Sequence, residues 1–211
     1  MIDYSLYLVT DDPPRYRGDW LDNVVAAVEG GVTCVQYRDT VSADGERYRR
    51  ALALKDALKG VPLIVNNDAR LAAAVKAEGV HVGQHDMSVA EVRRIVGPGC
   101  EIGLSITAPG QLSAIGPVRP DCLGAGPVFD ARKTKADAAD AMGTGGLAAV
   151  LRACAGTPAE GLPVVAIGGI TTANVAAVYS TGVDGVAVVS AFSQAADPRA
   201  VAATFRGLRP R

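Results

Sequence analysis

The 211-residue chain lacks the long apolar runs and the excess of one charge that mark several protein classes. No apolar run approaches the roughly 20 residues that cross a bilayer. The formal net charge is −1, so nothing suggests nucleic acid as a partner, and any positive charge that binds an anion must be local. No basic region precedes the first apolar run, in MIDYSLYLVTDD, which argues against a secretory signal.

The chain also has few cysteines and few aromatic residues, and neither group forms a motif. Cys34, Cys100, Cys122 and Cys154 include no C-x-x-C pair, so we expect buried, reduced thiols. The six tyrosines and one tryptophan show no spacing suited to stacking nucleic-acid bases. These absences predict a soluble, cytoplasmic protein that has neither nucleic acid nor a membrane as its partner.

Apolar residues, in contrast, make up 49% of the chain and recur in eight short runs. The runs are continuous rather than alternating, as in parallel strands that are covered on both faces. They are Tyr4–Thr10, Cys34–Tyr37, Leu63–Asn66, Gly79–Val82, Ile102–Ser105, Cys122–Gly124, Val164–Ile167 and Val186–Val189.

Between these runs lie alanine-rich segments whose apolar residues have helical spacing. The expected helices are Trp20–Glu29, Gly45–Leu58, Arg70–Ala77, Val89–Val96, Pro109–Ile115, Gly146–Ala153, Thr172–Ser180 and Pro198–Phe205. A strand–helix unit repeated eight times predicts a (β/α)8 TIM barrel, with a doubly wound open sheet as the rival. No linker divides the chain, so we expect one domain over residues 1–211.

Polar residues or glycines follow nearly every predicted strand, where a TIM barrel builds its active site. Each group alone fits a turn or a helix cap, but together they predict a polar pocket. The groups are Thr10–Asp12, Gln36–Asp39, Asn66–Asp68, Gly83–Asp86, Ser105–Thr107, Gly124–Pro127, Gly168–Gly169 and Ser190.

Two of these ends favour an anion. Gly168 and Gly169 stand between a strand and a helix expected from Thr172, and backbone N–H groups at such a place bind phosphate; the alternative is a tight turn. Arg38 and the cluster Arg132–Lys135 supply local positive charge, although such a cluster also fits a solvated loop. The cluster lies in the segment 129–142, which is longer and more polar than the other connections and therefore a candidate functional loop.

The two histidines form no nucleophilic triad. His81 lies inside a predicted strand and His85 lies in the loop after it. Neither has a paired partner in the sequence pattern, so the favoured interpretation of His81 is a core histidine whose hydrogen bonds are satisfied, with a chemical role as the alternative.

The strand ends, in this order, resemble the thiamine-phosphate synthase family. The matching segments are YLVTDD, GVTCVQYRD, LIVNND, GVHVGQHDM, IGLS, LGAGPVF, the TK of RKTK, GTGG, PVVAIGGI and DGVAVVSA. GVHVGQHDM is the most specific of them. The resemblance implies a TIM-barrel transferase that joins a hydroxymethylpyrimidine diphosphate to a thiazole phosphate, releases pyrophosphate and uses Mg²⁺ as its cofactor. Its partners would be these small-molecule substrates.

The resemblance also implies roles for individual residues. The pyrimidine diphosphate would contact residues at and after the end of the second strand, namely Gln36, Tyr37, Arg38, Asp39 and Thr40. It would also contact Asn66, Ser105 and Lys135. The thiazole phosphate would be held by Thr134 with the preceding Arg132 and Lys133, and by Gly169, Val189 and Ser190. Metal ligands would be Asn67 and Asp86, and catalytic residues would be Arg38, Ser105 and Lys135.

Three positions depart from the family pattern, and all concern the diphosphate or the metal. Asn67 stands where an aspartate is usual, and its amide oxygen carries no charge to favour Mg²⁺. We hypothesise that Asp68 replaces it or that Mg²⁺ binds weakly. Thr40 stands where a lysine is usual, and the loop before Thr134 has one extra residue. Arg132 or Lys133 would then replace the missing charge.

Two other functions stay open. A related barrel isomerase of the thiazole phosphate would need an acid–base side chain near the fifth strand end, where Thr107 offers none. A non-catalytic phosphate-binding barrel would suit the missing lysine and aspartate, but Asp86, Ser105 and Lys135 argue against it. The sequence leaves the oligomeric state open, a homo-oligomer included.

Overall fold

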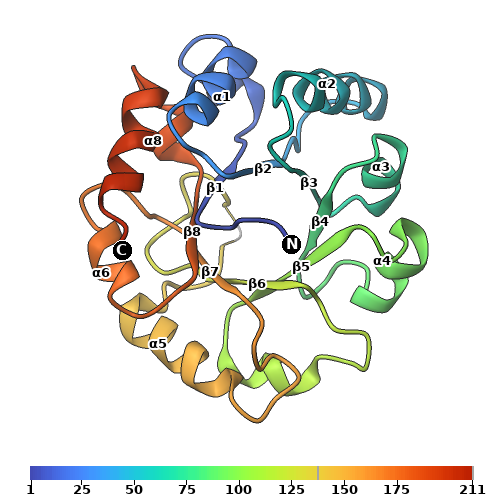
Figure 1. Cartoon of the computed structure of the whole chain (residues 1–211), viewed down its shortest axis with the longest axis vertical. Helices are drawn as coiled ribbons and strands as arrows, with labels where there is room; N and C mark the ends of the chain where they lie inside the picture. Colours follow the sequence, from blue (N-terminus) through green and yellow to red (C-terminus); the bar gives the residue numbers. More distant parts are fainter. Residues whose placement is uncertain (137, 211) are drawn as a thin grey trace.

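The computed structural model describes residues 1–136 and 138–210, and its eight strands are all parallel and form a closed barrel (Figure 1). Each strand pairs with the next along the chain, and the last pairs with the first, with Leu8 opposite Val188. The strands are β1 (Leu6–Val9), β2 (Cys34–Tyr37), β3 (Leu63–Asn66), β4 (Gly79–Val82), β5 (Glu101–Ile106), β6 (Cys122–Ala125), β7 (Val164–Ile167) and β8 (Gly185–Val188). The TIM-barrel prediction is confirmed, and the open sheet is excluded.

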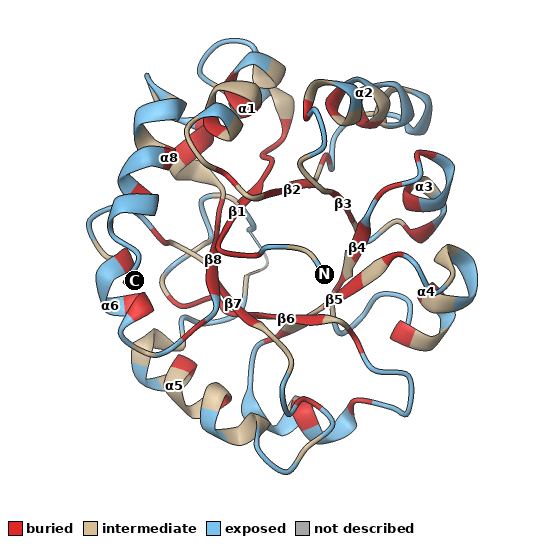
Figure 2. Cartoon of the chain, viewed as in Figure 1, coloured by how far each residue is buried: buried red, intermediate tan, exposed pale blue. Residues whose placement is uncertain are grey.

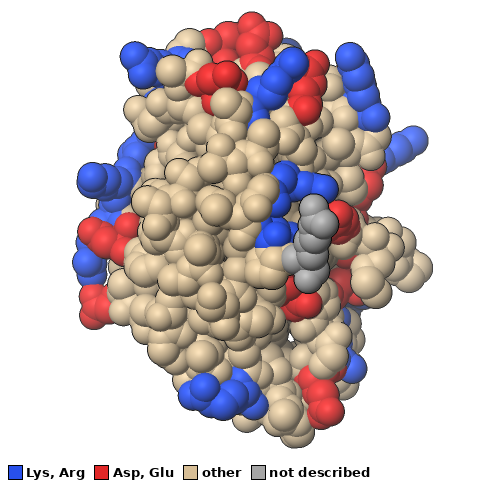
Figure 3. All heavy atoms as spheres, turned by 60° about the vertical axis from the view of Figure 1, so that its left-hand side comes forward, with Lys and Arg blue, Asp and Glu red and all other residues tan. Residues whose placement is uncertain are grey.

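The helices form a ring outside the strands, with their buried faces turned inward (Figure 2). They are α1 (Trp20–Glu29), α2 (Asp44–Ala57), α3 (Ala69–Ala74), α4 (Val89–Val96), α5 (Gly143–Cys154), α6 (Val175–Tyr179), α7 (Ser190–Ser193) and α8 (Pro198–Gly207), with 3-10 helices η1 (Pro13–Arg15) and η2 (Pro109–Ala114). None of these described helices is long and apolar enough to cross a membrane. Over the face shown in Figure 3, basic and acidic side chains are intermixed.

Three elements differ in kind from the predictions: the unpredicted 3-10 helix η1, and the segments η2 and α7. The segment predicted as a helix over Pro109–Ile115 is the 3-10 helix η2, because a proline and a glycine open it and leave few residues for an α-helical ladder. The four-residue helix α7 was not predicted, since so short a segment shows no period.

Alternate residues along the strands belong to two separate cores. Val35, Val65 and Val80 face outward and pack against the helices in the larger cluster. The smaller cluster fills the barrel interior and consists of Tyr4, Tyr7, Val9, Cys34, Ile64, Cys122, Val165 and Ala187. Because both faces of each strand are covered, the strands read as continuous apolar runs.

The N-terminal segment lies across one opening of the barrel (Figure 1). The Tyr4 hydroxyl donates to Glu101 Oε2 at 2.9 Å, and the backbone N–H of Ile2 donates to Oε1 of the same side chain at 2.8 Å. These bonds hold the segment at the N-terminal ends of the strands. The strand ends that the sequence predicted to form a polar pocket lie at the opposite end of the barrel.

The four thiols are free, but only three of them are buried as expected. Cys154 is half-buried, because it lies at the exposed C-terminal end of α5. Burial raises the pKa of Cys122 to about 12 and that of Cys100 to about 11. These two thiols are therefore protonated at neutral pH and are poor nucleophiles.

His81 on β4 points into the barrel, and its surroundings contradict the sequence interpretation. Its ring crosses toward Gly103 and Gly124, where added Cβ atoms would lie 2.2 Å from Nδ1 and 2.9 Å from Cε1. Nε2 lies 3.1 Å from Ser105 Oγ, but Nδ1 is buried without a partner among the described residues. The interpretation as a fully satisfied core histidine is therefore wrong, because the glycines that make room for the ring offer it no side-chain acceptor.

Burial lowers the pKa of His81 from 6.5 to about 4, so acid should destabilise the fold. Between these two pH values the unfolded chain binds a proton that the folded chain does not. We expect the free energy of unfolding to fall by roughly 3 kcal/mol as the pH drops through this window. Urea unfolding of His81→Asn should lack this loss, with His85→Asn as the matched control. An unchanged pH slope in His81→Asn would contradict the assignment.

Candidate active site

A layer of polar side chains from four consecutive strands lines the barrel interior near the strand ends. Gln36 on β2 donates from Nε2 to the Tyr7 hydroxyl at 2.7 Å. On β3, Asn66 pairs in register with His81 of β4. Ser105 on β5 contacts the His81 ring. The structure therefore brings together three residues predicted from sequence and one, His81, that had been interpreted as core.

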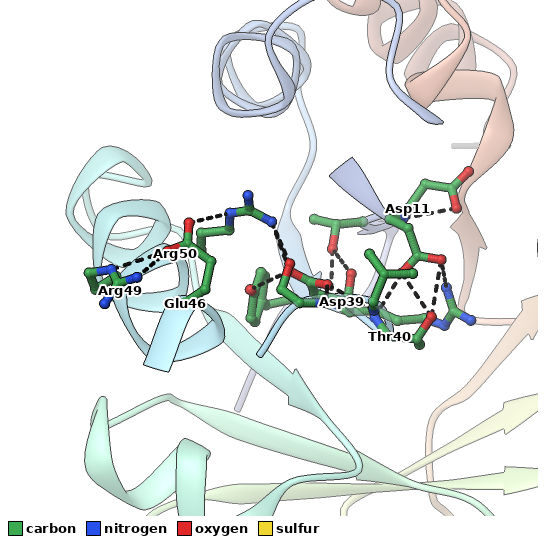
Figure 4. Close-up of polar contacts among 12 residues, drawn as sticks. Asp11, Asp39, Thr40, Glu46, Arg49 and Arg50 are labelled. Atoms are coloured by element: carbon green, nitrogen blue, oxygen red, sulfur yellow. Dashed lines mark hydrogen bonds and ion pairs between the residues drawn. The ribbon is translucent and has the colours of Figure 1, made fainter. Parts of the chain in front are cut away.

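Arg38, just after β2, is held by residues that follow β1. Thr10 Oγ1 accepts from the Arg38 backbone N–H at 2.7 Å, and Arg38 Nη1 lies 4.0 Å from Asp12 Oδ2. The buried Asp12 carboxylate also accepts from the backbone N–H of Thr40 at 2.7 Å and from its hydroxyl at 2.9 Å (Figure 4). Thr40 therefore turns its hydroxyl to Asp12, and Asp12 faces the guanidinium of Arg38.

Asp39 and Tyr37, both predicted to bind substrate, have protein partners on the outer side of the barrel wall. Asp39 is buried and accepts from Arg50 Nη1 and from the Tyr37 hydroxyl, both at 3.1 Å (Figure 4). Burial acts to raise the pKa of Asp39, but hydrogen bonds from Ser42, Val41 and Tyr37 hold it below its usual range. The carboxylate therefore stabilises the turn after β2.

The two predicted metal ligands lie in the loops after the paired strands β3 and β4. Asn67 is exposed, and its φ of 60° places it in the left-handed region, which asparagine tolerates. Asp86 Oδ2 accepts from the backbone N–H of Gly83 at 2.7 Å. One amide and one carboxylate are hard oxygen donors that fit Mg²⁺, which keeps several waters and also binds substrate phosphates. Within residues 1–136 and 138–210 there is no group of three or more His, Cys, Asp or Glu that could hold a metal.

Asp68 has other partners than a metal. Its Oδ1 accepts from the backbone N–H of Leu71 at 2.9 Å and so caps α3. Its Oδ2 lies 3.4 Å from Arg47 Nη2. One oxygen is fixed by the cap and the other has only this longer contact, so the hypothesis that Asp68 replaces the usual metal aspartate stays a prediction.

At the ends of β7 and β8, the groups available to bind a ligand are mostly backbone groups. Gly168 and Gly169 have φ values of 103° and 62°, and a Cβ atom added to Gly169 would lie 2.7 Å from Phe129 Cβ. The helix expected from Thr172 begins only at Val175, because residues 172–174 form a turn. The helix that starts beside these loops is α7, whose N-cap is Val189 and whose first residue is Ser190.

A buried carboxylate anchors α7. The Ser193 hydroxyl donates to Asp11 Oδ2 at 3.2 Å, and Asn23 Nδ2 donates to the Phe192 carbonyl at 3.1 Å. A short extra helix beside the loops after strands seven and eight is the common phosphate site of TIM barrels. Gly169, Val189 and Ser190, the residues predicted to bind a phosphate, lie directly after β7 and β8.

The long loop after β6 contains the basic cluster. Arg132 forms ion pairs with Asp130 and Asp140 of its own loop, so its charge is partly neutralised. Arg15 Nη1 donates to the Lys133 carbonyl at 2.6 Å, which joins the loop to η1. For the described part of the chain, no ion pair involves the side chains of Lys133 or Lys135. No hydrogen bond in that part joins the loop to Gln36, Asn66 or Ser105.

Sequence reasoning missed three residues of this region. The sequence shows His81 as a histidine within a strand and Asp12 as the last acid of VTDD. It does not show in which direction either side chain points. Arg15 follows two prolines in a segment without a period, so nothing in the sequence marked it as the link between two loops.

Comparisons with known proteins point to one family. Residues 6–192 match the family model described as thiamine monophosphate synthase. The thiamine-phosphate synthase of Laribacter hongkongensis is 45% identical over 99% of this chain and 97% of its own. That of Desulfitobacterium hafniense strain Y51 is 44% identical over 95% of each chain.

Solved structures show the same likeness. A thiamine phosphate pyrophosphorylase from Pyrococcus furiosus superposes with a TM-score of 0.84 at 31% identity, covering 98% of this chain and 95% of that one. A 3-hexulose-6-phosphate synthase, at 17% identity and a TM-score of 0.70, shares the fold. By sequence and by structure, the chain belongs to the thiamine monophosphate synthase family.

Proposed function

We propose that this chain is a thiamine-phosphate synthase. It joins 4-amino-2-methyl-5-(diphosphooxymethyl)pyrimidine to the thiazole phosphate and gives thiamine phosphate and pyrophosphate. The observation that carries the proposal is the convergence of Gln36, Asn66 and Ser105 in one polar layer of a barrel whose relatives carry this name. We also propose that residues 1–211 form one domain, which acts in the cytoplasm on small molecules alone.

In the proposed reaction, the bond between the pyrimidine methylene carbon and the diphosphate oxygen breaks, and the electron pair leaves with pyrophosphate. The thiazole nitrogen then forms a bond to the methylene carbon. Neither step needs a proton transfer at the reacting atoms, which suits a site without a nucleophilic triad. The protein therefore acts by positioning two substrates and by stabilising charge.

The diphosphate end of the site would use side chains. Arg38 and Lys135 would offer cations to the leaving pyrophosphate, and Gln36, Asn66 and Ser105 would orient the pyrimidine. The neutral ring of His81, held against Ser105 at 3.1 Å, would fix that hydroxyl. When Mg²⁺ is bound at Asn67 and Asp86, it supplies further positive charge to the diphosphate.

The thiazole phosphate end would use mainly the backbone. Gly169 and the start of α7 at Ser190 present N–H groups, and Thr134 adds a hydroxyl from the loop after β6. Backbone donors at glycines and helix starts approach a phosphate closely and favour its negative charge. The two ends together would hold the substrates side by side.

The direct test is the reaction itself. Purified protein with both substrates and Mg²⁺ should form thiamine phosphate and pyrophosphate in equal amounts, and chelation of the metal should stop both. Binding of the thiazole phosphate without any product would favour a non-catalytic barrel. Conversion of the thiazole phosphate alone would favour the isomerase.

The amide at position 67 should weaken Mg²⁺ binding. In Asn67→Asp, a second carboxylate beside Asp86 should raise the affinity roughly tenfold. Isothermal titration of Mg²⁺ in the presence of pyrophosphate, and the Mg²⁺ dependence of turnover, both measure this. The KM for the thiazole phosphate serves as the internal control and should stay constant. Equal Mg²⁺ affinities in the two proteins would show that the amide does not limit metal binding.

Asp12 should act as a positioning residue for Arg38. Asp12→Asn removes the charge that faces the guanidinium, and we expect the KM for the pyrimidine diphosphate to rise roughly fivefold. The KM for the thiazole phosphate should not change, whereas general loss of structure would alter both. The exposed Asp22 of α1 offers the control variant Asp22→Asn. Equal effects on both KM values would contradict the positioning role.

A further inference from the structure

A cavity of ≈550 Å³ lies at the ends of β2 and β3, beside α2 and α3. Its lining includes Thr40, Asn66 and Asn67, which belong to the proposed diphosphate and metal end of the site. Its lining also includes Arg47 of α2, a residue to which the proposed function gives no part. A cation therefore shares a cavity with the residues expected around the leaving group.

The guanidinium of Arg47 has donors that the protein does not use. Nη2 lies 2.9 Å from Asp44 Oδ1, but that carboxylate is 96% exposed, and such pairs contribute little. The contact with Asp68 is longer, at 3.4 Å, and Asp68 also caps α3. Nε of Arg47 is buried and has no hydrogen-bond partner among the described residues. A buried donor without an acceptor is costly, so the group is suited to receive an acceptor from a ligand.

The distribution of charge around the leaving group also favours Arg47 as a ligand-binding residue. Thr40 stands where the family usually has a lysine, and its hydroxyl is bonded to Asp12. Arg132 and Lys133, the residues expected to replace that lysine, lie on the loop after β6 and are not part of the lining of this cavity. In the cavity itself, the basic residues of the lining are Arg47 and Arg70, and only Arg47 also has the unpartnered buried donor.

We propose that Arg47 binds the diphosphate group of the pyrimidine substrate in this cavity, in place of the lysine missing at position 40. The proposal rests on the proposed function for the identity of the substrate. Arg47 exchanges its weak contacts with Asp44 and Asp68 for two parallel N–H bonds to phosphate oxygens, a geometry that arginine favours. The bound pyrophosphate product uses the same bonds.

The first variant is Arg47→Gln, which keeps a polar side chain and removes the charge. We expect the KM for the pyrimidine diphosphate, and the Kd for inorganic pyrophosphate by calorimetry, to rise about ten- to a hundredfold. The KM for the thiazole phosphate should stay the same. Arg49→Gln is the matched control, because Arg49 lies on the same helix, pairs with Glu46 and is not part of the cavity lining. It should bind pyrophosphate like the wild type.

The rescue variant separates binding from a structural role. Adding Thr40→Lys to Arg47→Gln should restore most of the pyrophosphate affinity, whereas a merely structural Arg47 would give a lower Tm that a lysine at position 40 does not repair. Unchanged pyrophosphate binding in Arg47→Gln would overturn the proposal. It would also be overturned if only Arg132→Ala combined with Lys133→Ala weakened that binding, because the loop after β6 would then supply the charge.

The pyrophosphate titration keeps this proposal distinct from the proposed function. If the wild-type protein makes no thiamine phosphate, the proposed reaction fails, and the affinities of the wild type and Arg47→Gln for pyrophosphate still decide the role of Arg47. A wild type that does not bind pyrophosphate would overturn the proposal for Arg47 as well.

Discussion

The pairing of β8 with β1 is the constraint on which the site depends. It closes the sheet, and a closed parallel barrel brings all eight strand ends to one rim. Closure requires a close approach at Gly185, where an added Cβ atom would lie 1.9 Å from the Tyr4 carbonyl oxygen. A glycine at this position lets β8 come within hydrogen-bonding distance of β1. Without closure, Asp11 after β1 could not anchor Ser193 of α7, and the expected phosphate site would lose its helix.

Much of the barrel could be predicted because each strand is buried on both faces. The apolar runs at β2, β3, β4 and β7 have the bounds that the sequence indicated, as do the helices α1 and α4. Because of this burial on both faces, the sequence did not show in which direction each side chain points. A continuous apolar run does not tell which residues face the barrel interior, so the role of His81 depended on the register with β5 and on the space at Gly103 and Gly124.

The site was predicted less completely than the fold, because its polar contacts cross between loops. Nothing in the order of residues shows that Asp12 after β1 would meet Arg38 and Thr40 after β2, or that Arg15 would meet the Lys133 carbonyl. The residues on strands were found because a strand end fixes their place. Asp39, on the loop after β2, took Tyr37 and Arg50 as partners on the outer wall, which only the folded chain reveals.

The change at position 40 illustrates how one substitution alters both charge and contacts. A lysine there could keep the backbone N–H bond to Asp12 but could not donate the Thr40 hydroxyl bond. Asp12, which already lies 4.0 Å from Arg38 and 3.9 Å from Arg15, would then face a third cation. With threonine, the hydroxyl satisfies the carboxylate, and Arg38 is the cation that Asp12 holds after β2. The chain thus has one fewer cation at this rim, and a diphosphate, which spreads several negative charges over its oxygens, needs another donor. Arg47 is placed to supply it because the start of α2 follows directly from the loop that contains Thr40.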